Sequence, residues 1–99
     1  MTAIDKNLIA VIAKHKTELT DRFDVKSLSI FGSVSKGKAG PDSDVDVLVH
    51  FRKTPGIFRF IVLKQFLEEI TGRPVDLVTE KALKKQMRKD ILQEAIRVA

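Results

Sequence analysis

The sequence predicts a small α/β or α+β domain with a mixed β-sheet of three or four strands flanked by helices. Helical and strand-like apolar patterns alternate along the chain, and Gly and Pro residues separate them. A length of 99 residues is enough for one hydrophobic core, near the small end of what folds without cross-links. We therefore expect a single domain over residues 1–99.

The first half of the chain is expected to contain one helix and two strands. Residues 4–20 carry apolar side chains at mostly helical spacing, which predicts an amphipathic helix with His15 on its polar side. A polar, turn-like segment follows at 21–24. The apolar runs 25–31 and 44–51 are expected to be strands, the second one longer.

The second half is expected to contain two helices and a further strand. After Pro55-Gly56, residues 57–70 are so rich in apolar side chains that a helix buried on most sides is predicted, ending at Thr71-Gly72. Residues 74–79 are expected to form a short strand. Residues 80–98 are expected to form a last helix, whose apolar stripe is most simply core: Leu83, Met87, Ile91 and Ile96.

Composition limits the classes of protein to consider. The chain has no cysteine, so disulfides and thiolate metal sites are excluded, which suits a reducing cytoplasm. No segment approaches the 18 apolar residues of a membrane span, and residues 1–6 do not resemble a secretory signal. We expect a cytoplasmic protein with no membrane partner.

The charge balance predicts an anionic partner. The formal net charge is +5, which suits a nucleotide, RNA or an acidic protein, although a solvated basic surface explains it as well. The chain has six phenylalanines, most of them in apolar runs, and no Tyr or Trp. Because these rings are expected in the core and not on a base-stacking platform, nucleic acid is not the expected partner.

The most informative segment is 30–49, IFGSVSKGKAGPDSDVDVLV. A strand-like run breaks at Gly32-Ser33, and Asp44 and Asp46 lie two residues apart at the start of the next strand. On a strand, such residues point to the same face, roughly 7 Å apart. Carboxylates this close repel each other unless a divalent cation lies between them, and a Gly-Ser turn offers N–H groups and a hydroxyl to phosphate oxygens. The pattern predicts metal-assisted handling of a nucleoside triphosphate.

The spacing also resembles a known family. Gly32-Ser33, a gap of ten residues and Asp44-Val45-Asp46 are similar to the signature of the DNA polymerase β-like nucleotidyltransferase superfamily. Asp76, in Pro-Val-Asp-Leu-Val, resembles the third carboxylate of that superfamily on a later strand. The resemblance covers essentially the whole chain and implies the polymerase β-like nucleotidyltransferase core, in the minimal form found in bacteria and archaea.

Resemblance to the minimal nucleotidyltransferases implies a partner and a reaction. Members are typically encoded beside a helical HEPN-type ribonuclease toxin, so the chain is expected to be an antitoxin that transfers AMP from ATP to a tyrosine of the toxin. Because the chain contains no tyrosine, such an acceptor must lie on another molecule. Two alternatives stay open: an antitoxin that neutralises its partner by binding alone, and a nucleotidyltransferase acting on RNA or a small molecule. A homo-oligomer or a hetero-oligomer is compatible with each.

The resemblance assigns roles to the three carboxylates. Asp44 and Asp46 are expected to bind two Mg²⁺ ions, one at the triphosphate and one at the attacking hydroxyl. Asp76 is expected either to complete the metal site or to act as the general base for that hydroxyl.

The residues expected to bind the nucleotide lie in the Gly-Ser turn and in the ten-residue segment 34–43 that follows it. Ser33 is expected to donate a hydrogen bond to a phosphate oxygen, with Gly32 allowing close backbone approach. Lys36 and Lys38 either neutralise the leaving pyrophosphate or are solvated loop lysines. A structural role is favoured for His50, and surface exposure for Arg73.

Overall fold

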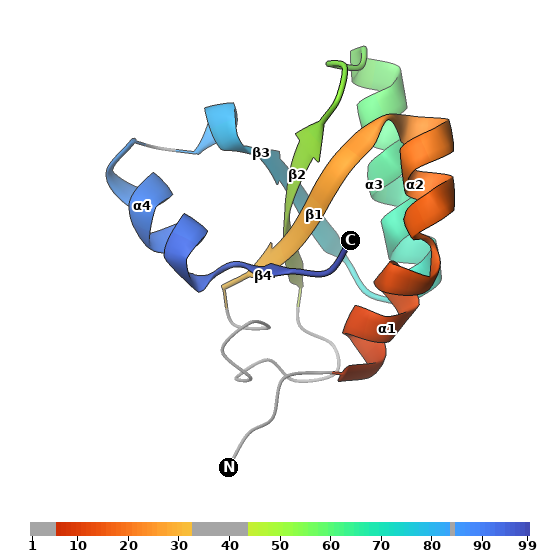
Figure 1. Cartoon of the computed structure of the whole chain (residues 1–99), viewed down its shortest axis with the longest axis horizontal. Coiled ribbons are helices and arrows are strands. Elements are labelled where there is room, and N and C mark those ends of the chain that lie inside the picture. Colours follow the sequence, from red (N-terminus) through yellow and green to blue (C-terminus); the bar gives the residue numbers. More distant parts are fainter. Residues whose placement is uncertain (1–5, 33–43, 84) are drawn as a thin grey trace.

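The computed structural model describes residues 6–32, 44–83 and 85–99, apart from the side chains of residues 6 and 85–87. Three helices pack on one face of a four-stranded sheet, and the fourth lies on the other side of it (Figure 1). The helices and strands are, in chain order, α1 (Lys6–Lys14), α2 (Lys16–Phe23), β1 (Val25–Phe31), β2 (Val45–Phe51), α3 (Ile57–Thr71), β3 (Val75–Thr79), the 3₁₀ turn η1 (Glu80–Ala82), α4 (Lys85–Glu94) and β4 (Ile96–Arg97).

The sheet is mixed, as predicted, with the strand order β3-β2-β1-β4. β1 is antiparallel to both β2 and β4, whereas β2 and β3 are parallel and are joined by the crossover helix α3. The last residues complete the sheet, because Leu28 N–H donates to Ala99 O at 3.2 Å and Val98 N–H donates to Leu28 O at 2.9 Å.

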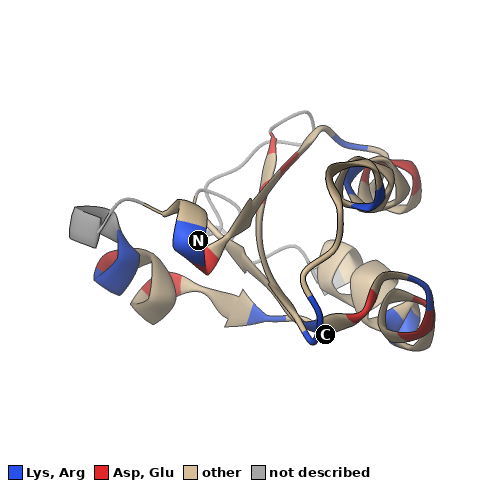
Figure 2. Cartoon of the chain, turned by 90° about the horizontal axis from the view of Figure 1, so that it is seen from above, with Lys and Arg blue, Asp and Glu red and all other residues tan. Residues whose placement is uncertain are grey.

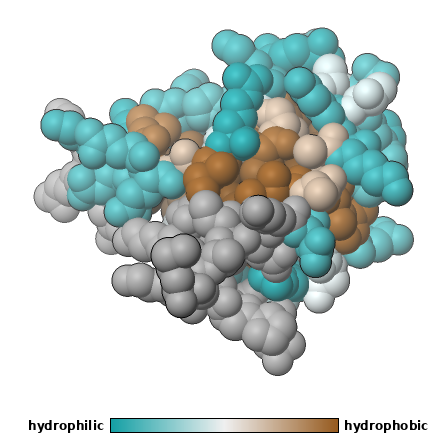
Figure 3. Space-filling model, turned by 60° about the horizontal axis from the view of Figure 1, so that its bottom comes forward, coloured by the Kyte–Doolittle hydropathy of each residue, from teal (hydrophilic) through white to brown (hydrophobic). Residues whose placement is uncertain are grey.

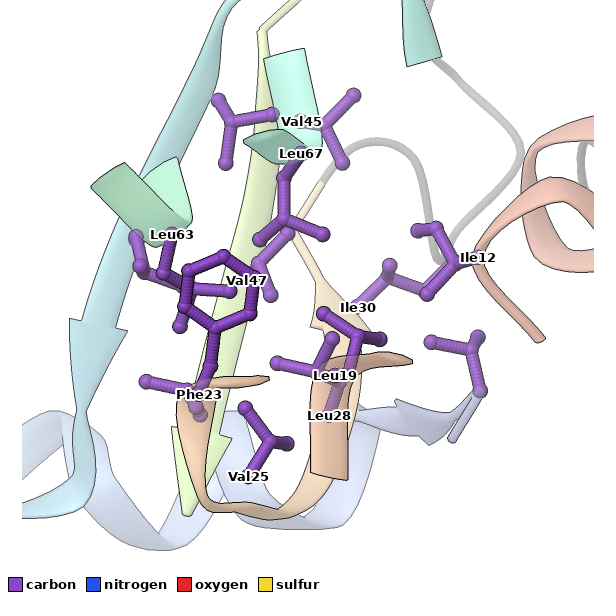
Figure 4. Packing of buried hydrophobic residues seen from close by; sticks show 14 of the residues in the cluster. Ile12, Leu19, Phe23, Val25, Leu28, Ile30, Val45, Val47, Leu63 and Leu67 are labelled. Carbon is purple, nitrogen blue, oxygen red and sulfur yellow. The ribbon is translucent and has the colours of Figure 1, made fainter. Parts of the chain in front are cut away.

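The core lies between the sheet and helices α1, α2 and α3. In β2, Val45, Val47 and Val49 alternate with residues that point to the other face, as expected for a strand. Figure 4 shows Leu63 and Leu67 of α3 directed at this valine row; both are fully buried. Alternation in β2 therefore leaves Asp46 on the face of the sheet opposite the core.

The first helix is two helices and not the single one expected. At His15 the backbone has φ −96° and ψ 15°, and its N–H donates to Ile12 O at 3.1 Å, three residues back instead of four. The ring Nδ1 lies 2.8 Å from Val11 O, and the ring meets Phe66 edge to face with centroids 5.7 Å apart. His15 is thus half-buried at a break, where a polar-side position was predicted.

Residues 21–23 also differ from the predicted turn, since they form the last turn of α2. The helix ends at Asp24, whose left-handed backbone (φ 54°) directs its N–H to Leu19 O and Thr20 O. Asn and Asp tolerate this conformation better than other residues with a side chain, and here Asp24 takes the place that glycine often holds.

α3 has the predicted limits, but the expectation of burial on most sides is wrong. Only Leu63 and Leu67 are buried, while Phe58 is 82% exposed. A helix that packs on one face of a sheet can bury only one stripe of its surface. Composition alone does not reveal which apolar residues lie on that stripe.

The last segment is not one helix over 80–98. Glu80–Ala82 is a 3₁₀ turn, α4 covers only Lys85–Glu94, and residues 96–97 are a strand. Of the predicted stripe, Ile96 lies on β4, and the side chain of Met87 is outside the described set. Pairing of β4 with β1 overrides the helical spacing at the end of the chain.

Charged residues of both signs alternate along the helices, so neither side of the molecule in Figure 2 has a single sign of charge. No helix in the described ranges is long and apolar enough to cross a membrane.

Candidate active site

Three strand ends meet at one edge of the sheet. β1 is antiparallel to β2, so it ends where β2 begins, and Phe31 is the partner of Asp46. β3 runs parallel to β2 and begins at the same edge, where Asp76 is in turn the partner of Asp46. Partners on neighbouring strands point to the same face of the sheet. The fold thus brings Asp46 and Asp76 side by side although 30 positions separate them in the sequence.

The electrostatics show that Asp44 belongs to the same group. Partial burial raises the pKa of Asp46 above its usual 3.8, and the charges of Asp76 and Asp44 raise it further. Asp44 and Asp76 are themselves exposed, and Asp44 immediately precedes β2. The charges of Asp44 and Asp76 therefore lie close enough to Asp46 to disfavour ionisation of its carboxyl group.

Gly32 is packed against this group. Its φ is 71°, a left-handed conformation that side chains rarely adopt. A Cβ placed on Gly32 would clash with Asp46 Oδ2 and would lie 3.4 Å from its Cγ. The position requires glycine for two reasons, and it sets the end of β1 directly against the Asp46 carboxylate.

The donor set fits a hard divalent cation. The described residues contain no ready-made group of three or more His, Cys, Asp or Glu side chains arranged to hold a metal ion. Asp44, Asp46 and Asp76 nevertheless offer only carboxylate oxygens, the ligands that Mg²⁺ takes in proteins. The charges of Asp44 and Asp76 oppose ionisation of Asp46, and a bound cation would reverse this effect.

Some of the predicted nucleotide-binding residues, Ser33, Lys36 and Lys38, lie outside the described residues. His50 is on the same face as Asp46, four residues along β2, and its Nε2 lies 3.6 Å from Glu80 Oε2. Arg73 is half-buried in the connection from α3 to β3, where its N–H donates to Thr71 Oγ1 at 3.4 Å.

Sequence reasoning missed Arg97 because it placed the residue in a helix. In β4, Arg97 is the partner of Ser29, two residues before Phe31 on the same strand. The pleat therefore puts Arg97 on the face that carries Asp46 and Asp76. Its Nε donates to Ala99 O at 3.1 Å, and the side chain is exposed. The alternation of apolar and polar side chains at Ile96, Arg97 and Val98 could have indicated a strand here.

Figure 3 shows the molecule with the bottom of the Figure 1 view turned forward. Hydrophobic surface gathers at the centre of this view, with hydrophilic residues above it and to either side.

Comparisons with known proteins give matches over most of the chain. Residues 12–98 match the model of the nucleotidyltransferase domain family. The chain is 42% identical over 89 residues to the protein adenylyltransferase MntA of Thermococcus cleftensis, covering 90% of each chain.

Solved structures have the same fold. A structure assigned as a minimal nucleotidyltransferase superposes with a TM-score of 0.78 at 32% identity, covering 97% of this chain and 98% of that one. The MNT antitoxin in complex with a tri-AMPylated HEPN toxin, from Shewanella oneidensis, gives a TM-score of 0.64 at 17% identity, with 92% and 71% covered. At that identity the second likeness concerns the fold alone.

Proposed function

Because the chain belongs to the nucleotidyltransferase domain family, we propose that it transfers AMP from ATP to a hydroxyl group of a HEPN-type toxin and so acts as an antitoxin. The observation that carries the proposal is the pairing of Asp46 with Asp76 across β2 and β3, with Asp44 and Gly32 beside them. The 42% identical relative named as a protein adenylyltransferase and the AMPylated toxin of the Shewanella complex support the acceptor class.

The residues at this edge of the sheet have different roles in the proposed reaction. Asp44, Asp46 and Asp76 would hold Mg²⁺, which when bound supplies charge neutralisation at the triphosphate and acidifies a hydroxyl. Gly32 lets the backbone approach the phosphates, with Ser33, Lys36 and Lys38 proposed as further phosphate contacts. Arg97 adds a cation on the same face of the sheet.

The transfer forms one P–O bond and breaks another. The acceptor oxygen attacks the α-phosphorus, the bond from that phosphorus to the bridging oxygen breaks, and pyrophosphate leaves with the bonding electrons. The hydroxyl proton passes to a carboxylate, for which Asp76 is the candidate base, and then to solvent. An acceptor tyrosine must be the toxin's, because the chain has none.

The test incubates the purified chain with Mg²⁺, α-labelled ATP and the product of the adjacent gene, the expected HEPN-type protein. Intact masses should show one or more AMP units on the HEPN-type protein. Asp44→Asn and Asp46→Asn should each abolish the transfer while the variants stay folded. Asp90→Asn, an equal change at an exposed position of α4, should leave it unchanged. Full transfer by either site variant would refute the assignment.

A binding antitoxin is the second candidate, and the exposed apolar surface of α3 favours it. In that case the wild-type chain and the Asp44→Asn/Asp46→Asn double variant should silence the toxin equally, with no added mass. If only the wild type silences it, occlusion alone is insufficient.

A further inference from the structure

An apolar patch lies on the outer side of the first two turns of α3. No described residue covers it, and it accounts for four of the five large apolar side chains that are exposed in the described chain. Spacings of one, four and five positions put its members on one side of the helix. The α3 patch consists of Ile57, Phe58, Ile61 and Val62, exposed by 67%, 82%, 43% and 45%.

The α3 patch is not needed for the core. Leu63 and Leu67 on the opposite stripe are the buried core residues of the helix, and the partly buried Phe60, Phe66 and Ile70 also pack against the core. The outer side becomes polar further along, at Gln65 and Glu69, so the apolar character is confined to one part of the helix. The patch exposes roughly 400–500 Å² of apolar surface, in the upper part of the range for soluble monomers, where such patches often mark interaction sites.

A groove continues from the α3 patch toward α1 and α2, with Val62 belonging to both. Its volume is about 690 Å³. Its walls combine apolar side chains with polar and charged ones of both signs, among them Val11, Phe66, Lys14, Arg22 and Glu69. The guanidinium of Arg22 lies 5.6 Å from the ring centroid of Phe66, which keeps this wall in place. The patch and the groove together offer a surface long enough for a helix.

The charge beside the α3 patch is positive at its N-terminal end. Arg52 and Arg59 both pair with Asp24, at 3.3 and 3.2 Å. Lys53, next in the chain to Arg52, is exposed. Two cations thus share one carboxylate, and Lys53 adds a third positive charge near them in the sequence, so the segment before and at the start of α3 carries an excess of positive charge that would attract acidic groups.

We infer that the α3 patch and its groove are the docking surface for an amphipathic helix of the acceptor protein, with acidic residues at the end that meets Lys53 and Arg59. An amphipathic helix places apolar side chains at every third or fourth position, which suits an elongated apolar surface of this kind. The inference rests on the proposed function for the partner's role as acceptor.

A second copy of the chain fits this surface less well. Symmetric pairing of two patches would bring the same cations together, on chains that each carry a net charge of +5. The patch alone is also smaller than the roughly 800 Å² per partner of a stable interface. A foreign helix that lies along both patch and groove covers more area and can supply the opposite charge.

The first experiment measures, by calorimetry, the dissociation constant for the HEPN-type protein of the transfer assay. Phe58→Asp should raise it at least tenfold and Phe58→Ala less, in the same direction. The control is Leu92→Asp, at a 40% exposed apolar position of α4, which should stay within twofold of wild type. The inference would be overturned if Phe58→Asp had the same dissociation constant as the wild type, or if the wild-type chain did not bind at all.

The second experiment tests the charge of the partner. Lys53→Glu should slow association and raise the dissociation constant several-fold at low salt, and added salt should reduce the difference. Lys89→Glu, the same change at an exposed position of α4, should have little effect. Tighter binding by Lys53→Glu would contradict an acidic partner helix.

Binding and transfer are read separately, so the two proposals can fail independently. If the wild type binds but transfers no AMP while Phe58→Asp loses binding, the docking surface holds and the proposed reaction fails. If Phe58→Asp binds the HEPN-type protein and transfers AMP to it normally while Asp46→Asn transfers nothing, the reaction holds and the docking surface fails. Sedimentation of the chain alone must show a monomer, because a dimer that Phe58→Asp dissociates would assign the patch to a second copy.

Discussion

Asp46 and Asp76 are directly opposite each other on the parallel strands β2 and β3, and each strand begins at the same edge of the sheet. Two carboxylates in this arrangement repel, and the pKa of Asp46 rises through its burial and through the charges of Asp76 and Asp44. The protein thus keeps an electrostatically unfavourable group at one edge, which is typical of sites that bind a cation.

Removal of Asp76 should therefore stabilise the metal-free protein. Asp76→Asn takes away a like charge beside Asp46, so the Tm measured in EDTA should rise by a few degrees. Added Mg²⁺ should raise the Tm of the wild type, because it binds the folded state, but should raise that of the variant little or not at all. An equal response of both proteins to Mg²⁺ would exclude Asp76 as a ligand.

Gly32→Ala should impair both stability and transfer. The left-handed backbone costs about 1–2 kcal/mol for a residue with a Cβ, and that Cβ would displace the Asp46 carboxylate. We expect transfer to fall at least tenfold.

The matched control is Gly72→Ala. Gly72 has nearly the same φ, 68°, at the end of α3, but a Cβ there meets nothing within 4 Å. Chemical denaturation should give a loss of about 1–2 kcal/mol from backbone strain alone, with transfer retained. Equal loss of transfer in both variants would mean that strain, and not the contact with Asp46, is responsible.

Glu68 should make the fold sensitive to acid. Its carboxylate accepts a hydrogen bond from Val75 N–H at 3.1 Å and one from Lys64 Nζ at 3.3 Å. The bond from Val75 lowers the pKa of Glu68 below its usual 4.5, with a smaller contribution from Lys64. A carboxyl group with a lowered folded-state pKa stabilises the protein above its unfolded pKa, and this stability is lost as the pH falls through the folded value.

The check is the Tm of wild type and Glu68→Gln as a function of pH. The wild type should be the more stable protein above about pH 5, and the difference should shrink as the pH falls below 4.5. Glu69→Gln, at the exposed neighbouring position, is the control. A difference that grows toward acid pH would contradict the assignment.

Two substitutions on α3 should separate its inner and outer sides. Leu67→Ala creates a cavity at a fully buried position, so it should cost about 2–5 kcal/mol in the free energy of unfolding. Phe58→Ala removes a larger side chain that is 82% exposed, so it should change stability by less than about 0.5 kcal/mol. Urea denaturation of both variants measures this, and a large loss for Phe58→Ala would show that the α3 patch supports the fold.

Much of the site followed from local sequence. The strand limits of β1 and the break at Gly32 come from a run of apolar residues that stops at a glycine. The prediction that Asp44 and Asp46 share a face rests on the period of two along a strand. These features depend on neighbouring residues alone, so periodicity and spacing predict them.

The errors of prediction share a cause. The outer side of α3, the break at His15 and the strand β4 depend on which other segment packs against them, and no local pattern contains that information. A helical apolar spacing over 80–98 predicts a helix there, but backbone pairing with β1 forms a strand at its end.

The sequence by itself determined the class of the domain, the glycine that ends β1, the Asp44-Val45-Asp46 spacing and the absence of any tyrosine that could be a self-acceptor. Only the tertiary structure decided that β3 lies parallel to β2 with Asp76 in register with Asp46, and that Arg97 shares their face. The register follows from the crossover through α3, whose Leu63 and Leu67 must pack on the valine row of β2. Long-range packing of this core, and not the residues near Asp76, therefore puts the third carboxylate in place.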